Sequence, residues 1–308
     1  MMQQSPREYS GASRRPPWAS PYLLLTLTAL FWSGNTVIGR ALHEAVPPVT
    51  LAFWRWSIAL VILLPWIAGP LARNWRVLAA NWRVMLLLSI LGVATYNTML
   101  YAALHTTTAT NSALINSACT LMIIAVNFLA FGVRASARQW LGLAASLAGV
   151  LAIVARGDPR VLAALELVRG DVLLIIAALF WAVYTACLRL RPRELDGLTF
   201  LGATIVIGVI ILAPIHVLEA LQAAPVAFSP GVIAGIAYTG IFPSVLAYLF
   251  WNKAVAEVGA NRAGQFLHLI PVLGTLMAVV FLRESLQAFH FAGAALICAG
   301  IYLASARY

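Results

Sequence analysis

Charged residues are scarce in this chain of 308 residues: they make up 10% of the sequence, while hydrophobic residues make up 62%. A soluble domain carries about 25% charged and about 45–50% apolar residues. The deficit of charge therefore excludes an ordinary water-soluble enzyme. Ten membrane helices of about 20 residues each would use roughly two-thirds of the chain. The composition thus predicts an all-α integral membrane protein without a separate soluble domain.

Acidic side chains are few, since ten Asp and Glu stand against 20 Lys and Arg and leave a formal charge of +10. In a soluble protein this excess would suggest nucleic-acid binding, but membrane proteins gather basic residues in their cytoplasmic loops. With the amino terminus inside, 14 basic residues fall in inner segments and five in outer ones. We expect both termini in the cytoplasm, a bacterial inner membrane as the location, and no nucleic-acid partner.

Cysteine is also rare, and the three residues Cys119, Cys187 and Cys298 all fall inside apolar runs. Their odd number and wide spacing give neither a disulfide framework nor a metal-ligand pattern. The pair His43-Glu44 begins a zinc motif that Pro47 interrupts, and the chain has no P-loop or nucleotide-binding glycine turn. We therefore expect no metal, no cofactor and no catalytic residues, which means that the chain is not an enzyme.

Long apolar segments are what the chain has in abundance, and the hydropathy pattern predicts ten of them. They span residues 21–42, 49–69, 84–104, 111–133, 137–155, 171–190, 198–218, 230–252, 262–282 and 287–305. The polar residues 1–20 are expected to form a disordered cytoplasmic tail. The first apolar segment is too long for the core of a signal peptide, so we expect it to remain as a membrane helix.

The two halves of the chain resemble each other. Residues 29–32 (Ala-Leu-Phe-Trp) recur at 178–181, and Thr36 recurs as Thr185. Glycines late in each half also match, namely Gly142 and Gly149 with Gly293 and Gly300. Since each half holds five helices, an odd number, the second half must enter the membrane from the opposite side. Such inverted repeats are typical of secondary transporters, which bind their substrate near the midplane.

The repeat predicts the division of the chain. We expect a first five-helix repeat over 21–155, an outer linker over 156–170 and a second five-helix repeat over 171–305. Residues between the helices are too few for any further domain. The predicted fold is therefore ten transmembrane helices arranged as two inverted five-helix repeats.

Several short motifs carry a resemblance to a known family. They are the two Leu-Phe-Trp helix openings, Phe53-Trp54-Arg55-Trp56, Pro271-Val272-Leu273, Leu282-Arg283-Glu284 and Gly293. In these motifs the chain resembles the EamA-type members of the drug/metabolite transporter superfamily over residues 21–305. The resemblance implies a ten-helix exporter with a central cavity, lined by helices 1, 3, 4, 6, 8 and 9 and braced by helices 5 and 10. It also implies export of amino acids, including aromatic ones.

Polar and aromatic side chains inside the apolar segments are the candidates for a substrate site, because polar groups in a bilayer tend to face a cavity or one another. The candidate substrate-binding residues are Trp32, Asn35, Tyr96, Asn97, Tyr101, Asn116, Trp181, Tyr184, Tyr248 and His268. The same residue types can instead hold helices together by hydrogen bonds. Other aromatic residues near helix ends are expected to anchor the chain at the membrane interface, namely Trp54, Trp56, Trp75, Trp82 and Tyr302.

Two prolines, Pro243 and Pro271, interrupt the hydrogen-bond ladder of the eighth and ninth segments and predict kinks or hinges. His268 is the one histidine well inside a segment, where it can titrate or simply bond a neighbouring helix. All ten acidic residues lie in loops, in the tail or at helix ends, so a permanent cation would lack a partner at the midplane.

These observations favour the export of neutral or zwitterionic amphipathic metabolites, above all amino acids with large side chains. A drug or organic-cation permease of the same fold is the alternative within the class. An intramembrane enzyme or a membrane scaffold is the alternative from other classes. The expected partners are the small-molecule substrate and the lipid bilayer, and the sequence is compatible with a monomer.

Overall fold

The computed structural model describes residues 20–282 and 286–306, within which the chain forms helices and connecting turns and no strand. An all-α fold was predicted from the composition and is confirmed. The predicted tail over 1–19, the pair Arg283-Glu284 of the family resemblance, and Arg307 lie outside the described residues.

The first half of the chain crosses the molecule five times. The passes are α1 (Pro21–Leu42), α2 (Pro48–Arg73), the succession α4 (Trp82–Leu88), η2 (Ser89–Thr95) and α5 (Tyr96–Leu104), then α6 (Ala109–Phe131) and α7 (Ala137–Val154). The short α3 (Trp75–Ala80) links the second pass to the third, and α8 (Arg160–Ala163) lies between the halves.

The second half repeats this course. The passes are α9 (Arg169–Cys187) with η3 (Leu188–Leu190), α10 (Gly197–Ala220), the succession α11 (Pro230–Thr239), η4 (Gly240–Leu246) and α12 (Ala247–Val258), then α13 (Ala260–Gln265), η5 (Phe266–His268) and α14 (Leu269–Leu282), and finally α15 (Ala288–Ser305). Nine helices among the described residues are long and apolar enough to cross a membrane. The remaining pass, over 260–282, is helical throughout but divided by the 3₁₀ turn η5.

Side-chain caps fix where several passes begin. Thr108, Ser136, Asp196 and Ser229 each accept a hydrogen bond from a backbone N–H of the turn that follows. Such N-caps satisfy donors that the helix itself leaves free. The predicted segment boundaries agree with these helix starts to within a few residues.

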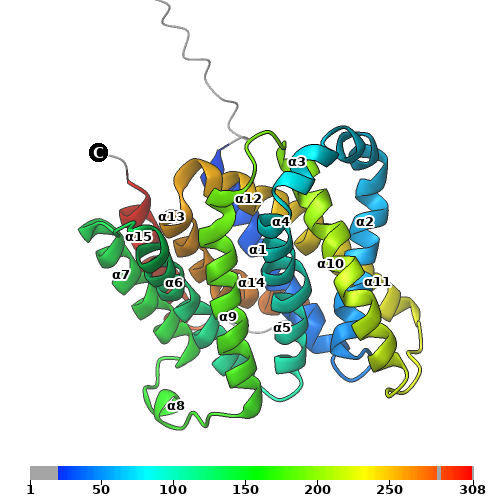
Figure 1. Cartoon of the computed structure of the whole chain (residues 1–308). Coiled ribbons are helices and arrows are strands. Elements are labelled where there is room, and N and C mark those ends of the chain that lie inside the picture. Colours follow the sequence, from blue (N-terminus) through cyan, green and yellow to red (C-terminus); the bar gives the residue numbers. More distant parts are fainter. Residues whose placement is uncertain (1–19, 283–285, 307–308) are drawn as a thin grey trace, which may run out of the picture.

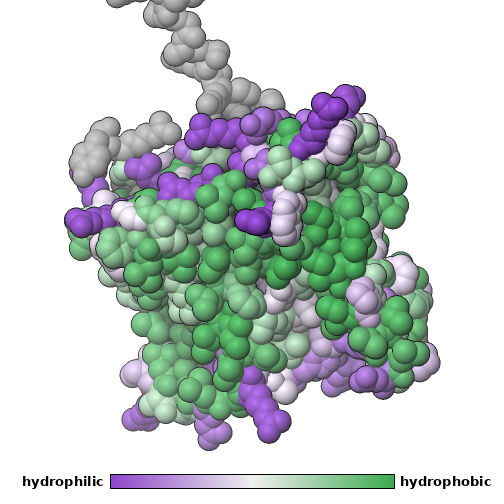
Figure 2. Space-filling model, viewed as in Figure 1, coloured by the Kyte–Doolittle hydropathy of each residue, from purple (hydrophilic) through white to green (hydrophobic). Residues whose placement is uncertain are grey.

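The surface of the molecule carries a broad apolar belt between two hydrophilic ends (Figure 2). This is the distribution that a bilayer imposes on a spanning bundle. The hydroxyl of Tyr22 in the first turn of α1 donates to the carbonyl of Ser305 at the end of α15, at 3.1 Å. The described chain therefore begins and ends on the same side of the belt.

Equivalent helices of the two halves pack against each other: α7 with α15 at one edge of the bundle and α2 with α10 towards the other (Figure 1). Gly142 faces Gly300 and Gly149 faces Gly293, so α7 and α15 run antiparallel. A Cβ atom added to Gly300 would lie 2.4 Å from the carbonyl oxygen of Gly142. Small residues allow this close backbone approach in membrane helices.

The third and eighth passes each contain a π-helical segment of seven residues, Ser89–Thr95 and Gly240–Leu246. Only the second contains a proline, Pro243, so a proline is not required for such a segment. In the second segment the hydroxyl of Ser244 donates to the carbonyl of Thr239, five residues earlier, at 2.7 Å. π-helical turns are frequent at functional sites, and these two face the centre of the bundle.

Candidate functional site

Aromatic rings from four helices meet at the centre of the bundle. The indole of Trp32 on α1 meets that of Trp181 on α9 edge to face, with ring centroids 4.9 Å apart. Trp251 on α12 lies 5.2 Å from Trp32 and 5.7 Å from Trp181, measured between ring centroids. Tyr96 at the start of α5 lies 4.9 Å from Trp181. We call Trp32, Trp181, Tyr96, Tyr248 and Trp251 the ring cluster.

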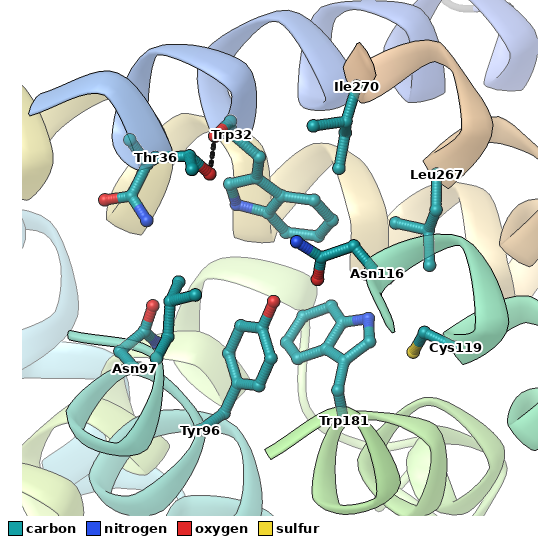
Figure 3. A pocket seen from close by; sticks show the side chains of 11 residues that line it. Trp32, Thr36, Tyr96, Asn97, Asn116, Cys119, Trp181, Leu267 and Ile270 are labelled. Atoms are coloured by element: carbon teal, nitrogen blue, oxygen red, sulfur yellow. Dashed lines mark hydrogen bonds between the residues drawn. The ribbon is translucent and has the colours of Figure 1, made fainter. Parts of the chain in front are cut away.

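A small pocket opens between these rings (Figure 3). It is lined by Trp32, Asn35, Thr36, Tyr96, Asn97, Leu100, Asn116, Cys119, Trp181, Leu267 and Ile270. The side chains of Tyr96 and Asn116 point into it, and Asn116 reaches between the two indoles (Figure 3). Its free volume is about 20 Å³, which is room for about one water molecule. In this conformation the centre is therefore closed to a solute of amino-acid size.

A guanidinium is buried beside the pocket. Arg55 on α2 is 0% exposed, and its Nε donates to the hydroxyl of Ser244 at 2.7 Å. Its Nη1 donates to the amide oxygens of Asn35 at 3.2 Å and Asn97 at 2.7 Å, and to the hydroxyl of Tyr101 at 2.6 Å. Asn35 and Asn97 also line the pocket, so they connect the positive charge to the cavity.

Arg55 has no carboxylate partner among the described residues, and its Nη2 has no hydrogen-bond partner there. The buried carboxylate of Asp171, at the start of α9, accepts hydrogen bonds from the side chains of Thr107 and Asn111. Glu219, at the end of α10, accepts hydrogen bonds from the first turn of α2. An unpaired charge inside a membrane is costly and marks a functional site by default.

The two π-helical segments supply polar backbone groups to the same region. The hydroxyl of Tyr248 donates to the carbonyl of Gly92 at 2.5 Å, and the indole N–H of Trp32 donates to the carbonyl of Pro243 at 3.2 Å. A π-helical turn shifts the backbone hydrogen bonds and leaves carbonyls that other side chains must satisfy. Each segment is thereby tied to a ring of the ring cluster on another helix.

Two tyrosine–asparagine pairs flank the ring cluster in mirrored positions. In the first half, Tyr101 on α5 donates to Asn35 on α1 at 2.7 Å. In the second half, Tyr184 on α9 donates to Asn252 on α12 at 2.9 Å. The helix α1 corresponds to α9, and α5 corresponds to α12. The asparagine and the tyrosine have therefore exchanged helices between the two halves, while the hydrogen bond between them is present in both. Only the pair in the first half also binds Arg55.

Arg40 at the end of α1 is bonded to the end of α5 and the turn that follows it: its Nη1 donates to the carbonyls of Leu104 at 2.5 Å and Thr107 at 3.0 Å. Beside it the imidazoles of His43 and His105 lie 5.6 Å apart. Partial burial, together with the nearby His43, lowers the pKa of His105 below its usual range.

The structure brings nine of the ten candidate residues to the centre. Six of them line the pocket, namely Trp32, Asn35, Tyr96, Asn97, Asn116 and Trp181. Tyr101, Tyr184 and Tyr248 are buried directly behind these residues. His268 is separate: its Nε2 lies 3.1 Å from the carbonyl oxygen of Ser117, and its neighbours Leu267 and Ile270 line the pocket instead.

Sequence reasoning missed Arg55 and misplaced Trp56. We expected Trp56 to be an interfacial anchor, but it is 0% exposed, its ring lies 5.0 Å from that of Tyr248, and the Arg55 guanidinium lies 4.9 Å from its ring centre. The anchor expectation for Trp56 is therefore wrong. The signal that could have identified Arg55 as a site residue was its position as a lone arginine inside a predicted membrane helix.

Metal binding has no counterpart in the described part of the chain, where no group of three or more His, Cys, Asp or Glu side chains is placed to hold an ion. The site instead offers flat aromatic faces, amide and hydroxyl dipoles, and one positive charge. Such a surface can accommodate an amphipathic solute with an anionic group.

Several known proteins that are similar to this chain over most of its length are named as transporters or exporters. An uncharacterized transporter of Archaeoglobus fulgidus is 30% identical over 287 residues, which cover 93% of this chain and 97% of the relative. The uncharacterized transporter YyaM of Bacillus subtilis is 25% identical, with 92% and 93% covered. A probable terminal-alkyne amino-acid exporter of Streptantibioticus cattleyicolor is 27% identical, with 92% of each chain covered.

The fold also matches a solved crystal structure at a TM-score of 0.73 and 20% sequence identity, covering 93% of this chain and 96% of that one. The EamA-like transporter family matches this chain twice, over residues 19–155 and 168–306. The two matches correspond to the two halves that repeat in sequence and structure. This multi-pass membrane protein therefore belongs to the EamA-like transporter family.

Proposed function

We propose that this protein exports zwitterionic amino acids with large, neutral side chains from the cytoplasm by alternating access at the ring cluster. The observation that carries the proposal is Arg55, a buried guanidinium without a carboxylate partner among the described residues. A substrate carboxylate would complement this charge, and charged hydrogen bonds to a guanidinium are the strong ones. A cationic solute would be repelled by this guanidinium and would find no carboxylate partner among the residues that line the pocket.

The rings supply the second half of the recognition. Trp32 and Trp181 present faces and edges within one pocket, and contacts between aromatic rings contribute about 0.5–1.5 kcal/mol beyond the burial of area. A large apolar side chain gains from these surfaces. The amino-acid exporter among the relatives is consistent with this substrate class.

The proposal includes an orientation. The antiparallel packing of α7 on α15 supports two inverted repeats, and the excess of basic residues on the side of the chain ends supports cytoplasmic termini in a bacterial inner membrane. A monomer contains the whole ring cluster. The proposal assigns transport and no catalytic step to the chain.

Counterflow in proteoliposomes tests the substrate class. We expect labelled L-phenylalanine to exchange faster than a labelled quaternary ammonium dye, and its exchange to continue without a pH gradient, because no central carboxylate relay is needed. Arg55→Gln should lower the exchange of phenylalanine about tenfold or more, whereas the same change at Arg76 on the linking helix α3 should leave it unaltered.

Two results would reject this proposal. One is faster exchange of the dye, which would indicate an organic-cation permease. The other is amino-acid flux that stops entirely when the pH gradient is removed, which would require a titrating relay in the transport path.

A further inference from the structure

A second, larger cavity opens on the side of the membrane where the described chain begins and ends. It has a volume of about 520 Å³, which lies in the range of small-molecule sites. It is formed where the fourth, sixth and eighth passes end, and these even-numbered passes all end on that side. In contrast to the closed centre, it can hold a solute of amino-acid size.

Positive charge dominates the walls of this cavity. Arg189, Arg191 and Arg193 line it, and none of its lining residues is acidic. The guanidinium of Arg189 lies over the ring of Phe131 at 4.7 Å from the ring centre. A cation–π contact leaves the edge of the guanidinium available for an anion.

Buried donors without partners lie at the inner end. Thr185 is 1% exposed and Asn252 is 3% exposed, and both line the cavity. The hydroxyl of Thr185 and the amide nitrogen of Asn252 have no hydrogen-bond partner among the described residues. Buried polar groups are normally paired, so two unpaired donors in one wall indicate a place where a ligand supplies the acceptor.

The same wall leads to the ring cluster. The amide oxygen of Asn252 accepts the hydrogen bond from Tyr184, and the ring of Tyr184 lies 5.0 Å from that of Trp181. A ligand bound at Asn252 would thus be separated from the central pocket by Tyr184, which is hydrogen-bonded to Asn252.

We propose that this cavity is a carboxylate-binding vestibule, in which the arginines attract the anionic group of the substrate and Thr185 and Asn252 receive it before it passes Tyr184. The inference rests on the proposed function for the identity of the substrate. Whatever the substrate, the arginines and the neutral donors of this cavity would recognise an anionic oxygen group.

An anionic lipid headgroup presents the same chemistry, since basic residues near a cytoplasmic surface attract such lipids. The experiment therefore separates a soluble carboxylate from a lipid. It is carried out on the full chain in vesicles of phosphatidylcholine alone and in vesicles that also contain phosphatidylglycerol.

The first measurement is the reactivity of a cysteine placed in the cavity. In a background with Cys119, Cys187 and Cys298 replaced by Ala, Ala256→Cys is reacted with an anionic and with a cationic methanethiosulfonate reagent. We expect the ratio of the anionic to the cationic rate to fall about tenfold when the three cavity arginines are changed to Gln. At the control position Ala80→Cys, on the same side beside other arginines, the three changes should leave this ratio unaltered.

The second measurement is protection of Ala256→Cys in phosphatidylcholine vesicles. L-Phenylalanine and phenylacetate should each slow the labelling severalfold, whereas L-phenylalanine amide, which lacks the carboxylate, should not. A ratio of rates that is insensitive to the three arginines would overturn the inference. Protection by phosphatidylglycerol with none by either carboxylate would also overturn it, in favour of a lipid site.

The failure of the proposed function gives a different result. If phenylacetate protects the cysteine but phenylalanine neither protects it nor exchanges in counterflow, the amino-acid proposal is rejected and the carboxylate vestibule stands. If phenylalanine exchanges while neither carboxylate protects, the vestibule is rejected and the exporter stands.

Discussion

At the scale of single residues, the centre of the protein combines one buried charge with neutral polar groups. Arg55 is held by the side chains of Asn35, Asn97, Tyr101 and Ser244. None of these partners carries a negative charge, so their dipoles solvate the guanidinium without neutralising it. The pocket thereby keeps a positive charge beside it, and this charge is the basis for proposing a substrate with a carboxylate.

The aromatic residues of the site could be predicted from the sequence better than its charge. Trp32 and Trp181 stood out because they recur at equivalent repeat positions. Arg55 was overlooked since nothing in the spacing of helix α2 shows that four polar side chains from other helices converge on it. Trp56 was misplaced for the same reason: its distance from the helix end suggested the interface, but tertiary packing buries it.

Trp181→Ala should lower the initial rate of phenylalanine transport about two- to tenfold, because the variant loses ring contacts worth about 0.5–1.5 kcal/mol beyond area. The rates are measured in proteoliposomes, with size-exclusion chromatography to show that the variant is folded. Trp181→Phe should restore part of the rate. Trp75→Ala, at a residue 59% exposed, is the control and should transport like the wild type. If Trp181→Ala also transports like the wild type, the ring is only structural.

At the scale of helices, hydropathy predicted the number and place of the membrane passes, and it did so because length and apolar content are all that a bilayer demands. It could not predict the π-helical segments Ser89–Thr95 and Gly240–Leu246 or the 3₁₀ turn Phe266–His268. In each π-helical segment a side chain from another helix bonds a backbone carbonyl, and this partner cannot be identified from the segment's own sequence. The role of Pro243 and Pro271 as hinges stays a prediction.

Gly300→Ala should destabilise the packing of α15 on α7, because the new methyl group would lie 2.4 Å from the carbonyl oxygen of Gly142. Overpacking of this kind costs about 1–3 kcal/mol, which should appear as a lower midpoint of thermal unfolding in detergent. Gly274→Ala is the matched control, since nothing lies within 4 Å of the added atom. Equal unfolding midpoints for the two variants would contradict the close contact.

Asp196 caps α10 by accepting hydrogen bonds from the backbone N–H groups of Leu198 at 2.9 Å and Thr199 at 3.0 Å. Partial burial raises the pKa of this carboxyl, but the hydroxyl and N–H of Thr199 outweigh it and hold the pKa below its usual range. Since the folded state prefers the ionised form, the cap stabilises at pH values above the unfolded pKa of about 3.9. This contribution is lost as the pH falls through the lower folded pKa.

Asp196→Ala should therefore lower the free energy of unfolding by about 1 kcal/mol at pH 7, and the difference from the wild type should shrink at pH values below about 4. Thermal unfolding in detergent over a pH series measures both effects. Asp196→Asn keeps a neutral cap, so its stability relative to Asp196→Ala should not change with pH. A wild-type advantage that stays constant down to pH 3 would contradict the role of the charge.

At the scale of the whole molecule, the two halves meet through equivalent helices and enclose the ring cluster between them. The repeat could be predicted from short sequence matches, but the mirrored pairs Tyr101–Asn35 and Tyr184–Asn252 could not, because their residue types are exchanged. A search for identical residues at equivalent positions passes over them. What the two halves share at this position is the tyrosine–asparagine hydrogen bond, not the residue type on each helix.

A green fluorescent protein fused after Arg307 should fluoresce, and alkaline phosphatase fused there should be inactive, because we expect both termini in the cytoplasm. The contact of Tyr22 with Ser305 places the two ends of the described chain on one side of the belt, and we expect from the basic residues that this side is cytoplasmic. Phosphatase inserted after Leu165, between the halves, should be active. The reverse pattern would overturn the orientation, and with it the direction assigned to the vestibule.

The close packing of the indoles in the ring cluster should give the protein a near-ultraviolet circular dichroism signal that reports on the site. The ring centroids of Trp32, Trp181 and Trp251 lie within 5.7 Å of one another. Trp32 and Trp181 line a pocket with room for about one water. A larger solute can enter only if side chains that line this pocket move, and we expect the two indoles to be among them. Near-ultraviolet circular dichroism, which depends on fixed side-chain packing, would then change with occupancy of the site, so binding could be followed on the unlabelled protein.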